Sequence, residues 1–158
     1  MSVSRSLDSD HQLARLLQIG IVLEEVVEAR ASKHAEAVAG ETAVVEYMAG
    51  AAEESATHRD RLEAIIADLD AETVPFEEIE ALVEATYEAD SDFDDVLYDQ
   101  LCNEETAYKF YDDLIEAIEN SDTEFSVDTG GVLETLAEIR AEEEAGVEEV
   151  TTLMERRA

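Results

Sequence analysis

The sequence predicts an all-α fold, built as a bundle of four long helices. Three observations lead to this fold class. Apolar residues recur at intervals of three and four along most of the chain, which is the period of an amphipathic helix. The sustained alternation of apolar and polar residues that marks a half-buried strand is absent. The chain has one proline and six glycines, so few residues interrupt long helices.

The first helix is expected over residues 10–39. Ser9 and Gln12 have the spacing of a capping box, in which the serine side chain accepts a hydrogen bond from the first turn. Gly40 supplies a stop. The apolar positions share one face at about 100° per residue: Leu13, Leu16, Leu17, Gly20, Val27, Ala31, Ala35 and Val38. Residues 19–23 are apolar almost all round the helix, which favours a subunit interface because an exposed stripe of this kind is otherwise a liability.

The second helix is expected over residues 41–69, followed by a connection of about twenty residues. Its apolar face consists of Val44, Met48, Ala51, Leu62, Ile65, Ile66 and Leu69. Within the connection, Pro75 occupies a position where a missing N–H does no harm, at the start of a short helix over about residues 75–89. A connection of this length allows two helical hairpins to pack as one bundle.

The third and fourth long helices are expected over residues 92–120 and 130–156. The face of the third is formed by Leu97, Leu101, Tyr108, Tyr111, Ile115 and Ile118, and that of the fourth by Val132, Leu136, Ile139, Val150, Leu153 and Met154. Residues 1–158 are therefore predicted to form one domain, a size that buries roughly 70% of its unfolded surface.

Charge is the strongest feature of the composition. The chain has 42 acidic and 10 basic residues, for a formal net charge of −32, and its only lysines are Lys33 and Lys109. This charge would repel itself in dilute buffer, whereas at molar salt the Debye length falls to about 3 Å and screens the repulsion. The composition therefore favours a halophile that keeps salt inside the cell. It argues against binding to nucleic acids, which need a basic patch, and to anionic membranes.

We also expect a cytoplasmic protein. Cys102 is the single cysteine, which rules out an internal disulfide and fits a reducing compartment. The N-terminus lacks the basic and apolar regions of a signal peptide, and the longest apolar run, residues 19–23, is too short to cross a bilayer.

Several residues break the pattern of the apolar faces. They are Glu24 and Glu28 in the first helix, Ser55 and His58 in the second, Glu104 in the third, and Glu143 and Gly146 in the fourth. A carboxylate that faces a core is costly unless it is paired or binds a metal. Carboxylate and imidazole groups are ligands that iron and manganese accept. The other reading for Glu104 is a buried acid that is hydrogen-bonded to Tyr108, Tyr111 or a tyrosine of another helix.

Four short motifs resemble those of ferritin-like, rubrerythrin-type proteins. Residues 104–111 are similar to the Glu-x-x-Ala-x-x-Phe-Tyr pattern of their third helix. Residues 28–31 resemble the version in the first helix, residues 57–62 the end of the motif in the second, and residues 140–144 the motif in the fourth. The resemblance implies an antiparallel four-helix bundle with a short crossover helix, a dimer that pairs through its first helices, and a di-iron carboxylate centre that reacts with oxygen or peroxide.

The chain departs from the two Glu-x-x-His motifs of such centres. Ser55 stands three residues before His58, and Gly146 stands three residues after Glu143, so the second histidine is missing. If Glu144 were the ligand in place of Glu143, the matching position would be Val147. Glu54 lies at the flank and could fill a gap.

The predicted ligands for iron, or for manganese, are Glu28, Glu54, His58, Glu104 and Glu143. The choice between Glu24 and Glu28 stays open, because the helical wheel places Glu24 more centrally whereas the motif favours Glu28. His34 is expected to have a structural role. The alternative function is a metal-free bundle that acts as an interaction or structural module, with a protein partner.

Overall fold

The computed structural model describes residues 7–73, 75, 77–78, 81 and 96–157. This part of the chain contains four long α-helices and no strand: α1 (Asp10–Ala37), α2 (Thr42–Asp68), α4 (Val96–Glu119) and α5 (Thr129–Arg157). The predictions of an all-α fold and of four long helices are confirmed. The predicted short helix over residues 75–89 lies outside the described residues, apart from residues 75, 77, 78 and 81.

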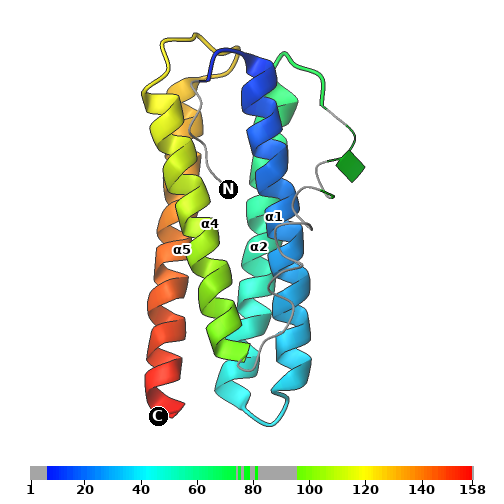
Figure 1. Cartoon of the computed structure of the whole chain (residues 1–158), viewed down its shortest axis with the longest axis vertical. Helices are drawn as coiled ribbons and strands as arrows, with labels where there is room; N and C mark the ends of the chain where they lie inside the picture. Colours follow the sequence, from blue (N-terminus) through cyan, green and yellow to red (C-terminus); the bar gives the residue numbers. More distant parts are fainter. Residues whose placement is uncertain (1–6, 74, 76, 79–80, 82–95, 158) are drawn as a thin grey trace.

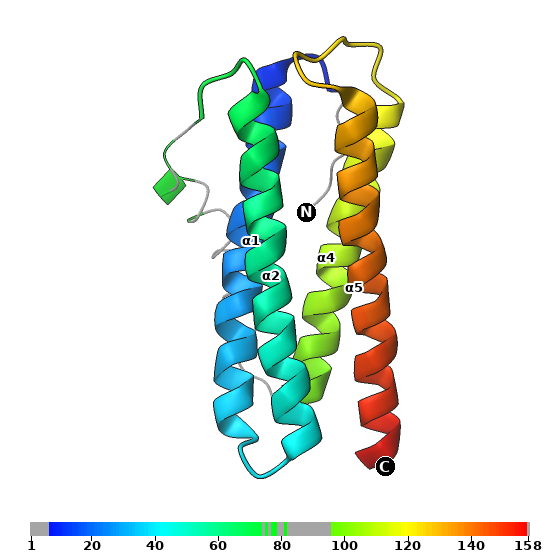
Figure 2. The same ribbon diagram turned by 180° about the vertical axis from the view of Figure 1, so that it is seen from behind.

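The helices pack as two hairpins (Figures 1 and 2). α1 runs down the view of Figure 1 and α2 returns beside it, while α4 runs up and α5 returns. α2 and α4 therefore run in the same direction, and the end of α2 and the start of α4 lie at opposite ends of the bundle. The two helices of each hairpin pack more extensively against each other than against the helices of the other hairpin.

The ends of the helices follow the sequence signals to within a few residues. The Ser9 side chain accepts a hydrogen bond from the Gln12 backbone N–H at 3.2 Å, which is the predicted cap. At the same end of the bundle, the Ser121 hydroxyl donates to the Leu7 carbonyl and the Ser126 N–H donates to Asp10. These bonds fasten the α4–α5 loop to the start of the chain.

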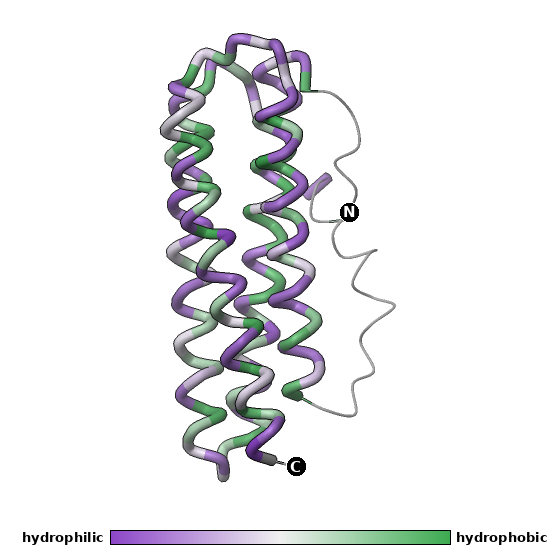
Figure 3. The backbone as a smooth tube through the Cα atoms, turned by 90° about the vertical axis from the view of Figure 1, so that its left-hand side faces the viewer, coloured by the Kyte–Doolittle hydropathy of each residue, from purple (hydrophilic) through white to green (hydrophobic). Residues whose placement is uncertain are grey.

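The core is divided into two apolar clusters. The larger, called the upper core here, lies toward the α4–α5 loop and includes Leu13, Leu17, Ile21, Leu62, Phe110, Leu114, Leu136 and Ile139. The smaller, called the lower core, lies toward the α1–α2 turn and consists of Val38, Val44, Met48, Leu97, Val150 and Leu153. Along every helix, apolar positions recur among polar ones with the helical period (Figure 3). Between the two clusters lies a band of buried polar side chains.

Six of the predicted inward positions of α5 are buried and two are half-buried. Gly146 and Met154 are half-buried, whereas Val132, Leu136, Ile139, Glu143, Val150 and Leu153 are buried, at spacings of four, three, four, seven and three residues. This is the repeat of a helix that presents one seam to its neighbours. Glu143 therefore lies in the seam, at the level where apolar residues give way to the polar band.

The subunit interface predicted at residues 19–23 rested on the assumption that their apolar side chains are exposed, and this assumption is wrong. Residues 19–23 were expected to form an exposed stripe, but Ile21, Val22 and Leu23 are each only 1% exposed within the single chain. They pack into the upper core, so no partner is needed to cover them. The homodimer stays a prediction without this support. No helix in the described part of the chain combines the length and the apolarity needed to cross a bilayer.

Candidate metal centre

Three buried side chains from three helices meet in the polar band. Glu24 of α1 and His58 of α2 are 0% exposed, and Glu143 of α5 is 3% exposed. The His58 Nδ1 atom lies 3.3 Å from Glu24 Oε1 and 3.1 Å from Glu143 Oε1. One ligand atom from each residue lies within 4.8 Å of the others. We call Glu24, His58 and Glu143 the inner group.

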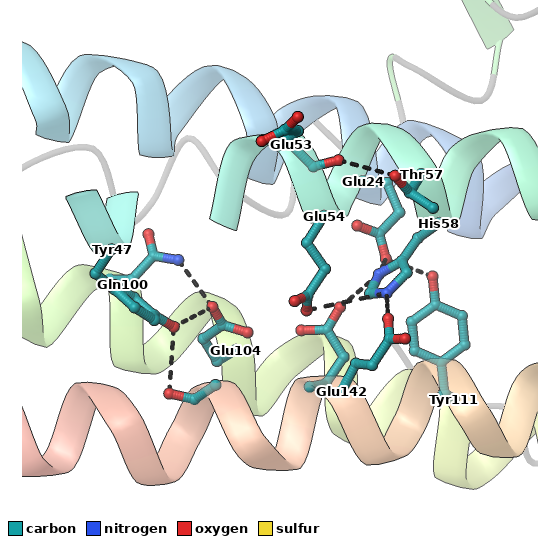
Figure 4. A network of polar contacts seen from close by, with 12 residues as sticks. Glu24, Tyr47, Glu53, Glu54, Thr57, His58, Gln100, Glu104, Tyr111 and Glu142 are labelled. Atoms are coloured by element: carbon teal, nitrogen blue, oxygen red, sulfur yellow. Dashed lines mark hydrogen bonds and ion pairs between the residues drawn. The ribbon is translucent and has the colours of Figure 1, made fainter. Parts of the chain in front are cut away.

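Two further carboxylates face the other side of the His58 ring (Figure 4). His58 Nε2 lies 2.5 Å from Glu142 Oε2 and 3.9 Å from Glu54 Oε1. The side chains of Glu54 and Glu142 are 41% and 45% exposed, so this side of the ring is near solvent. We call Glu54, His58 and Glu142 the outer group. Their ligand atoms also lie within 4.8 Å of one another.

Tyrosines fix two of the buried carboxylates. The Tyr111 hydroxyl donates to Glu24 Oε1 at 2.5 Å. Glu104 Oε1 accepts from the Tyr47 hydroxyl at 2.8 Å and from Gln100 Nε2 at 3.0 Å. The Tyr111 hydrogen bond is shorter than an ordinary neutral one, as expected when the acceptor is a carboxylate, whereas the Tyr47 distance is ordinary.

Glu104 reaches toward the inner group across the backbone of α5. A Cβ atom added at Gly146 would lie 2.6 Å from Glu104 Oε2, so only a glycine leaves space for this carboxylate. The Tyr47 hydroxyl also lies 3.2 Å from the Gly146 carbonyl oxygen. Glu104 is hydrogen-bonded to Glu143, although it belongs to neither group. Because Gly146 has no side chain, the carboxylate of Glu104 from α4 occupies the space beside the α5 backbone.

The cluster changes the proton affinities of its members. Burial raises the pKa of Glu143 well above its usual range, and repulsion from Glu24 adds to this effect. Burial also raises the pKa of Glu54 to about 7, although attraction to His58 opposes it. For His58, burial acts to lower the pKa, but hydrogen bonds to Glu143 and Glu24 outweigh it and raise the pKa to about 11. The metal-free cluster therefore holds protons tightly.

Nearby arginines do not neutralise this cluster. The Arg59 guanidinium lies 2.6 Å from Glu28, Arg140 lies 2.8 Å from Asp112, and Arg61 pairs with Glu138. The predicted ligand Glu28 is therefore placed elsewhere: it pairs with Arg59, and its side chain is 31% exposed. Of the two alternatives, Glu24 is the residue that faces His58.

One carboxylate oxygen of the inner group has no partner. Glu24 Oε2 is buried without a hydrogen bond, while Glu24 Oε1 accepts from Tyr111. A buried acceptor without a donor is unfavourable unless a proton or a cation satisfies it. A proton or a cation at Glu24 Oε2 would satisfy this atom.

The structure brings together most of the residues singled out from the sequence. Glu54, His58 and Glu143 lie in the two groups, with Glu24 in place of Glu28. Glu104 lies beside Glu143, and its partner is a tyrosine of another helix, Tyr47. Glu144 is exposed and Glu143 is buried, which decides between those two alternatives. Whether the residues bind a metal stays a prediction.

Three contributors were missed from the sequence. Glu142 is exposed and precedes the buried Glu143, so a helical wheel assigns it to solvent. Gln100 is buried one helical turn before Glu104, on the same face of α4, and Tyr47 reaches Glu104 from α2 through a long side chain. Two of the three had a sequence signal: Gln100 stands four residues before Glu104, a spacing that places two side chains on one helix face, and a tyrosine of another helix was considered as a partner for Glu104.

A second buried histidine lies nearer the α1–α2 turn. His34 Nε2 lies 2.5 Å from Asp99 Oδ2, and the Arg30 guanidinium lies 3.1 Å from Asp99 Oδ1. His34 Nδ1 lies 3.4 Å from Gln100 Oε1. We call His34, Asp99 and Arg30 the His34 cluster. It joins α1 to α4, in line with the structural role expected for His34.

Comparison of the chain with protein-family models, with curated proteins and with solved structures found no significant match. The arguments for function therefore rest on the geometry and chemistry of the two groups.

Proposed function

We propose that the chain is a ferritin-like metalloprotein that binds an iron or manganese ion at Glu24, His58 and Glu143. One observation carries the proposal. Three fully buried side chains from three helices bring oxygen and nitrogen ligand atoms within 4.8 Å of one another, and one oxygen among them, Glu24 Oε2, lacks any partner.

The donor set fits the proposed ions. Carboxylate and imidazole ligands suit iron and manganese, whereas a site without cysteine is less suited to softer metals. His58 Nδ1 faces the two buried carboxylates, and Nε2 faces Glu142 at 2.5 Å. A metal-binding histidine usually donates its second N–H to a carboxylate or carbonyl. In this proposal Nδ1 is the ligand and Nε2–H donates to Glu142.

The charge of the cluster supports a cation. Five carboxylates surround His58 directly or through Glu143: Glu24, Glu54, Glu104, Glu142 and Glu143. Uncompensated buried charge is strongly unfavourable. A divalent ion would supply the positive charge that the neighbouring arginines, which pair elsewhere, do not.

The proposed chemistry is a reaction with oxygen or peroxide, for which a bound iron or manganese ion would supply the electrons. The residues of the chain keep the ligands in place. Tyr111 orients Glu24, while Tyr47 and Gln100 hold Glu104 next to Glu143 as a further carboxylate. Three protein ligands leave coordination positions open, which reactive metal sites need.

The assignment to the ferritin-like class is part of the proposal. The directions of the helices in Figure 1 support it, because α2 and α4 run the same way and need one long connection. The motifs at residues 57–62, 104–111 and 140–144 support it as well, whereas the motif at residues 28–31 does not, because Glu28 pairs with Arg59.

Metal analysis of the native protein tests the proposal. We expect about one equivalent of iron or manganese per chain by plasma mass spectrometry, after purification in molar salt. Glu24→Gln should lose the metal, while Glu28→Gln, a matched change one helical turn away, should keep it. A wild-type protein that retains no metal after anaerobic loading with ferrous iron and desalting refutes the proposal.

A second candidate is a metal-free bundle that serves as an interaction or structural module. One observation favours it: both ring nitrogens of His58 already have carboxylate partners, so a protonated His58 could satisfy the cluster alone. Nitrogen NMR of the His58 imidazole distinguishes the metal-free bundle from the metalloprotein. This candidate requires both ring nitrogens to carry protons in the native protein, whereas the metalloprotein requires Nδ1 without a proton.

A further inference from the structure

An open cleft lies between α2 and α5 beside the outer group. Its volume is about 300 Å³. Its walls come from four small residues, Gly50 and Ala51 of α2 and Ala145 and Gly146 of α5. Glu104 contributes the buried floor, and Glu54 and Glu142 lie along the side. We call this space the Gly50 cleft.

The cleft and the two groups form a continuous sequence of decreasing exposure. Glu46 and Glu149 line the cleft and are exposed. The half-buried Glu54 and the exposed Glu142 also line it, and both face His58 Nε2. The opposite nitrogen of the same ring faces the buried Glu24 and Glu143. In Figure 4, Glu54 and Glu142 appear between Glu104 and His58.

We propose that the Gly50 cleft is the route by which a divalent cation reaches the inner group, and that the outer group captures the ion on the way. This inference rests on the proposed function, because it assigns the path to that metal site. The inner group is too buried to take an ion directly from solvent, since none of its side chains is more than 4% exposed.

The lining of the cleft selects for cations. Of the ten described residues that line it, five are glutamates and none is basic. Clefts lined by one sign of charge concentrate ions of the opposite sign and repel those of the same sign. A volume of this size holds about ten water molecules at roughly 30 Å³ each, which is enough for an ion that still carries part of its hydration shell.

Gly50 is the position from which the route can be closed without disturbing the ligands. It is exposed, and a Cβ atom added there meets nothing within 4 Å. A large side chain at this position would extend over the cleft. Gly146 is unsuitable for this purpose because it is in close contact with Glu104.

A second cleft supplies a matched control. It has a volume of about 340 Å³ and is lined by residues of α2, of α5 and of the loop before α5 that belong to neither group, among them Ala64, Ile65 and Val132. Ala64, like Gly50, is an exposed position of α2. Gly50→Phe and Ala64→Phe therefore add similar bulk to two clefts of similar size on the same helix.

Stopped-flow binding of Co²⁺ to the full chain tests the route. The visible absorption of Co²⁺ reports coordination by nitrogen and oxygen. We expect Gly50→Phe to slow both association and dissociation on the order of tenfold, a size of effect within what clefts exert on ion association. The equilibrium Kd should stay unchanged, because the route affects the barrier and not the bound state. Ala64→Phe should bind like the wild type.

Each other outcome has a defined meaning. If the wild type binds Co²⁺ and Gly50→Phe has wild-type rates, the route is refuted while the metal site stands. If Gly50→Phe weakens the equilibrium binding at an unchanged association rate, the cleft belongs to the bound state and the route is again refuted. If the wild type binds neither Co²⁺ nor ferrous iron, the proposed function fails, and the route with it. Circular dichroism confirms that each variant is folded, and Gly50→Leu replaces Gly50→Phe if the latter is not.

Discussion

The two buried histidines of the bundle lie among carboxylates, but their surroundings differ in charge. In the His34 cluster, one aspartate meets one imidazole and one guanidinium. Around His58, four carboxylates, those of Glu24, Glu54, Glu142 and Glu143, meet a single imidazole without an arginine. Both histidines bridge helices, so their position alone does not distinguish them.

The difference separates a structural network from a candidate binding site. Asp99 is balanced by Arg30 and His34, so the His34 cluster needs no further charge. The carboxylates around His58 can be balanced only by protons or by a cation. A buried ionisable cluster with unbalanced charge is a candidate for function, whereas a balanced one is more typical of a contact that fixes helix positions.

Removal of each histidine should produce the largest contrast. We expect His58→Ala to abolish retention of the metal, because it removes the only nitrogen ligand. His34→Ala should keep the metal but lower the free energy of unfolding by about 1–3 kcal/mol, because it leaves a buried Asp99 with one partner fewer. Metal content and denaturant unfolding measure both effects. Equal metal loss in the two variants would mean that the clusters are not functionally distinct.

The next contrast separates the two exposed acids that flank Glu143. Glu142→Gln should weaken metal binding by roughly 10–100-fold, because the carboxylate that orients His58 is lost. Glu144→Gln changes the same charge on an exposed side chain without a described contact to His58, and the affinity should stay the same. Titration with Mn²⁺ at fixed ionic strength measures both values. Equal weakening in the two variants would indicate a general effect of charge instead.

The stability of the protein should fall with rising pH without metal, whereas the stabilisation by bound metal should grow with pH. The pKa of His58 is raised in the folded state to about 11 and that of Glu54 to about 7, so the metal-free folded protein binds protons more tightly than the unfolded chain. Stability should therefore fall as pH rises, first between about 4.5 and 7 through Glu54 and then above about 6.5 through His58. Solvent screens the Glu54 contribution.

Thermal unfolding from pH 6 to 9 checks this sign. With a chelator, Tm should fall as pH rises, and His58→Gln should flatten the curve. With saturating Mn²⁺, the stabilisation by metal should grow with pH, because the ligands must lose their protons to bind. A metal-free protein whose Tm rises over this range would contradict the proton-holding cluster.

The smallest contrast compares two glycines of facing helices. Gly50→Ala should stabilise the protein by about 1 kcal/mol through helix propensity alone, because its Cβ meets nothing. Gly146→Ala should be less stable than Gly50→Ala by about 1–3 kcal/mol, because its Cβ would displace the Glu104 carboxylate. Chemical unfolding of both variants provides the comparison. Equal stabilisation would show that Glu104 moves away freely.

The sequence predicts much of the fold because the helical period is regular. His58, Glu104 and Glu143 fall on inward faces that periodicity alone defines, and all three are buried. It could not choose between Glu24 and Glu28, which differ by only about 40° around the helix. That choice depends on where Arg59 of α2 lies, and Arg59 draws Glu28 to the flank.

Contacts between helices that are distant in the sequence could not be predicted either, because they depend on how the helices pack against one another. The pairing of Arg30 with Asp99 depends on the axial position of α1 against α4, and no local pattern encodes that position. Glu142 was missed because a long side chain can bend from an exposed position toward a buried partner. Periodicity predicts which face a residue occupies, but not how far its side chain reaches.

The separation of the upper and lower cores has a consequence for cooperativity. All four helices pass through both cores, but the polar band between them contributes little apolar burial. The lower core, with only six buried residues, can then open as a local unit while the upper core stays folded. Amide hydrogen exchange near the α1–α2 turn would be faster than in the upper core, and an ion that joins α1, α2 and α5 at the band would make the two units open together.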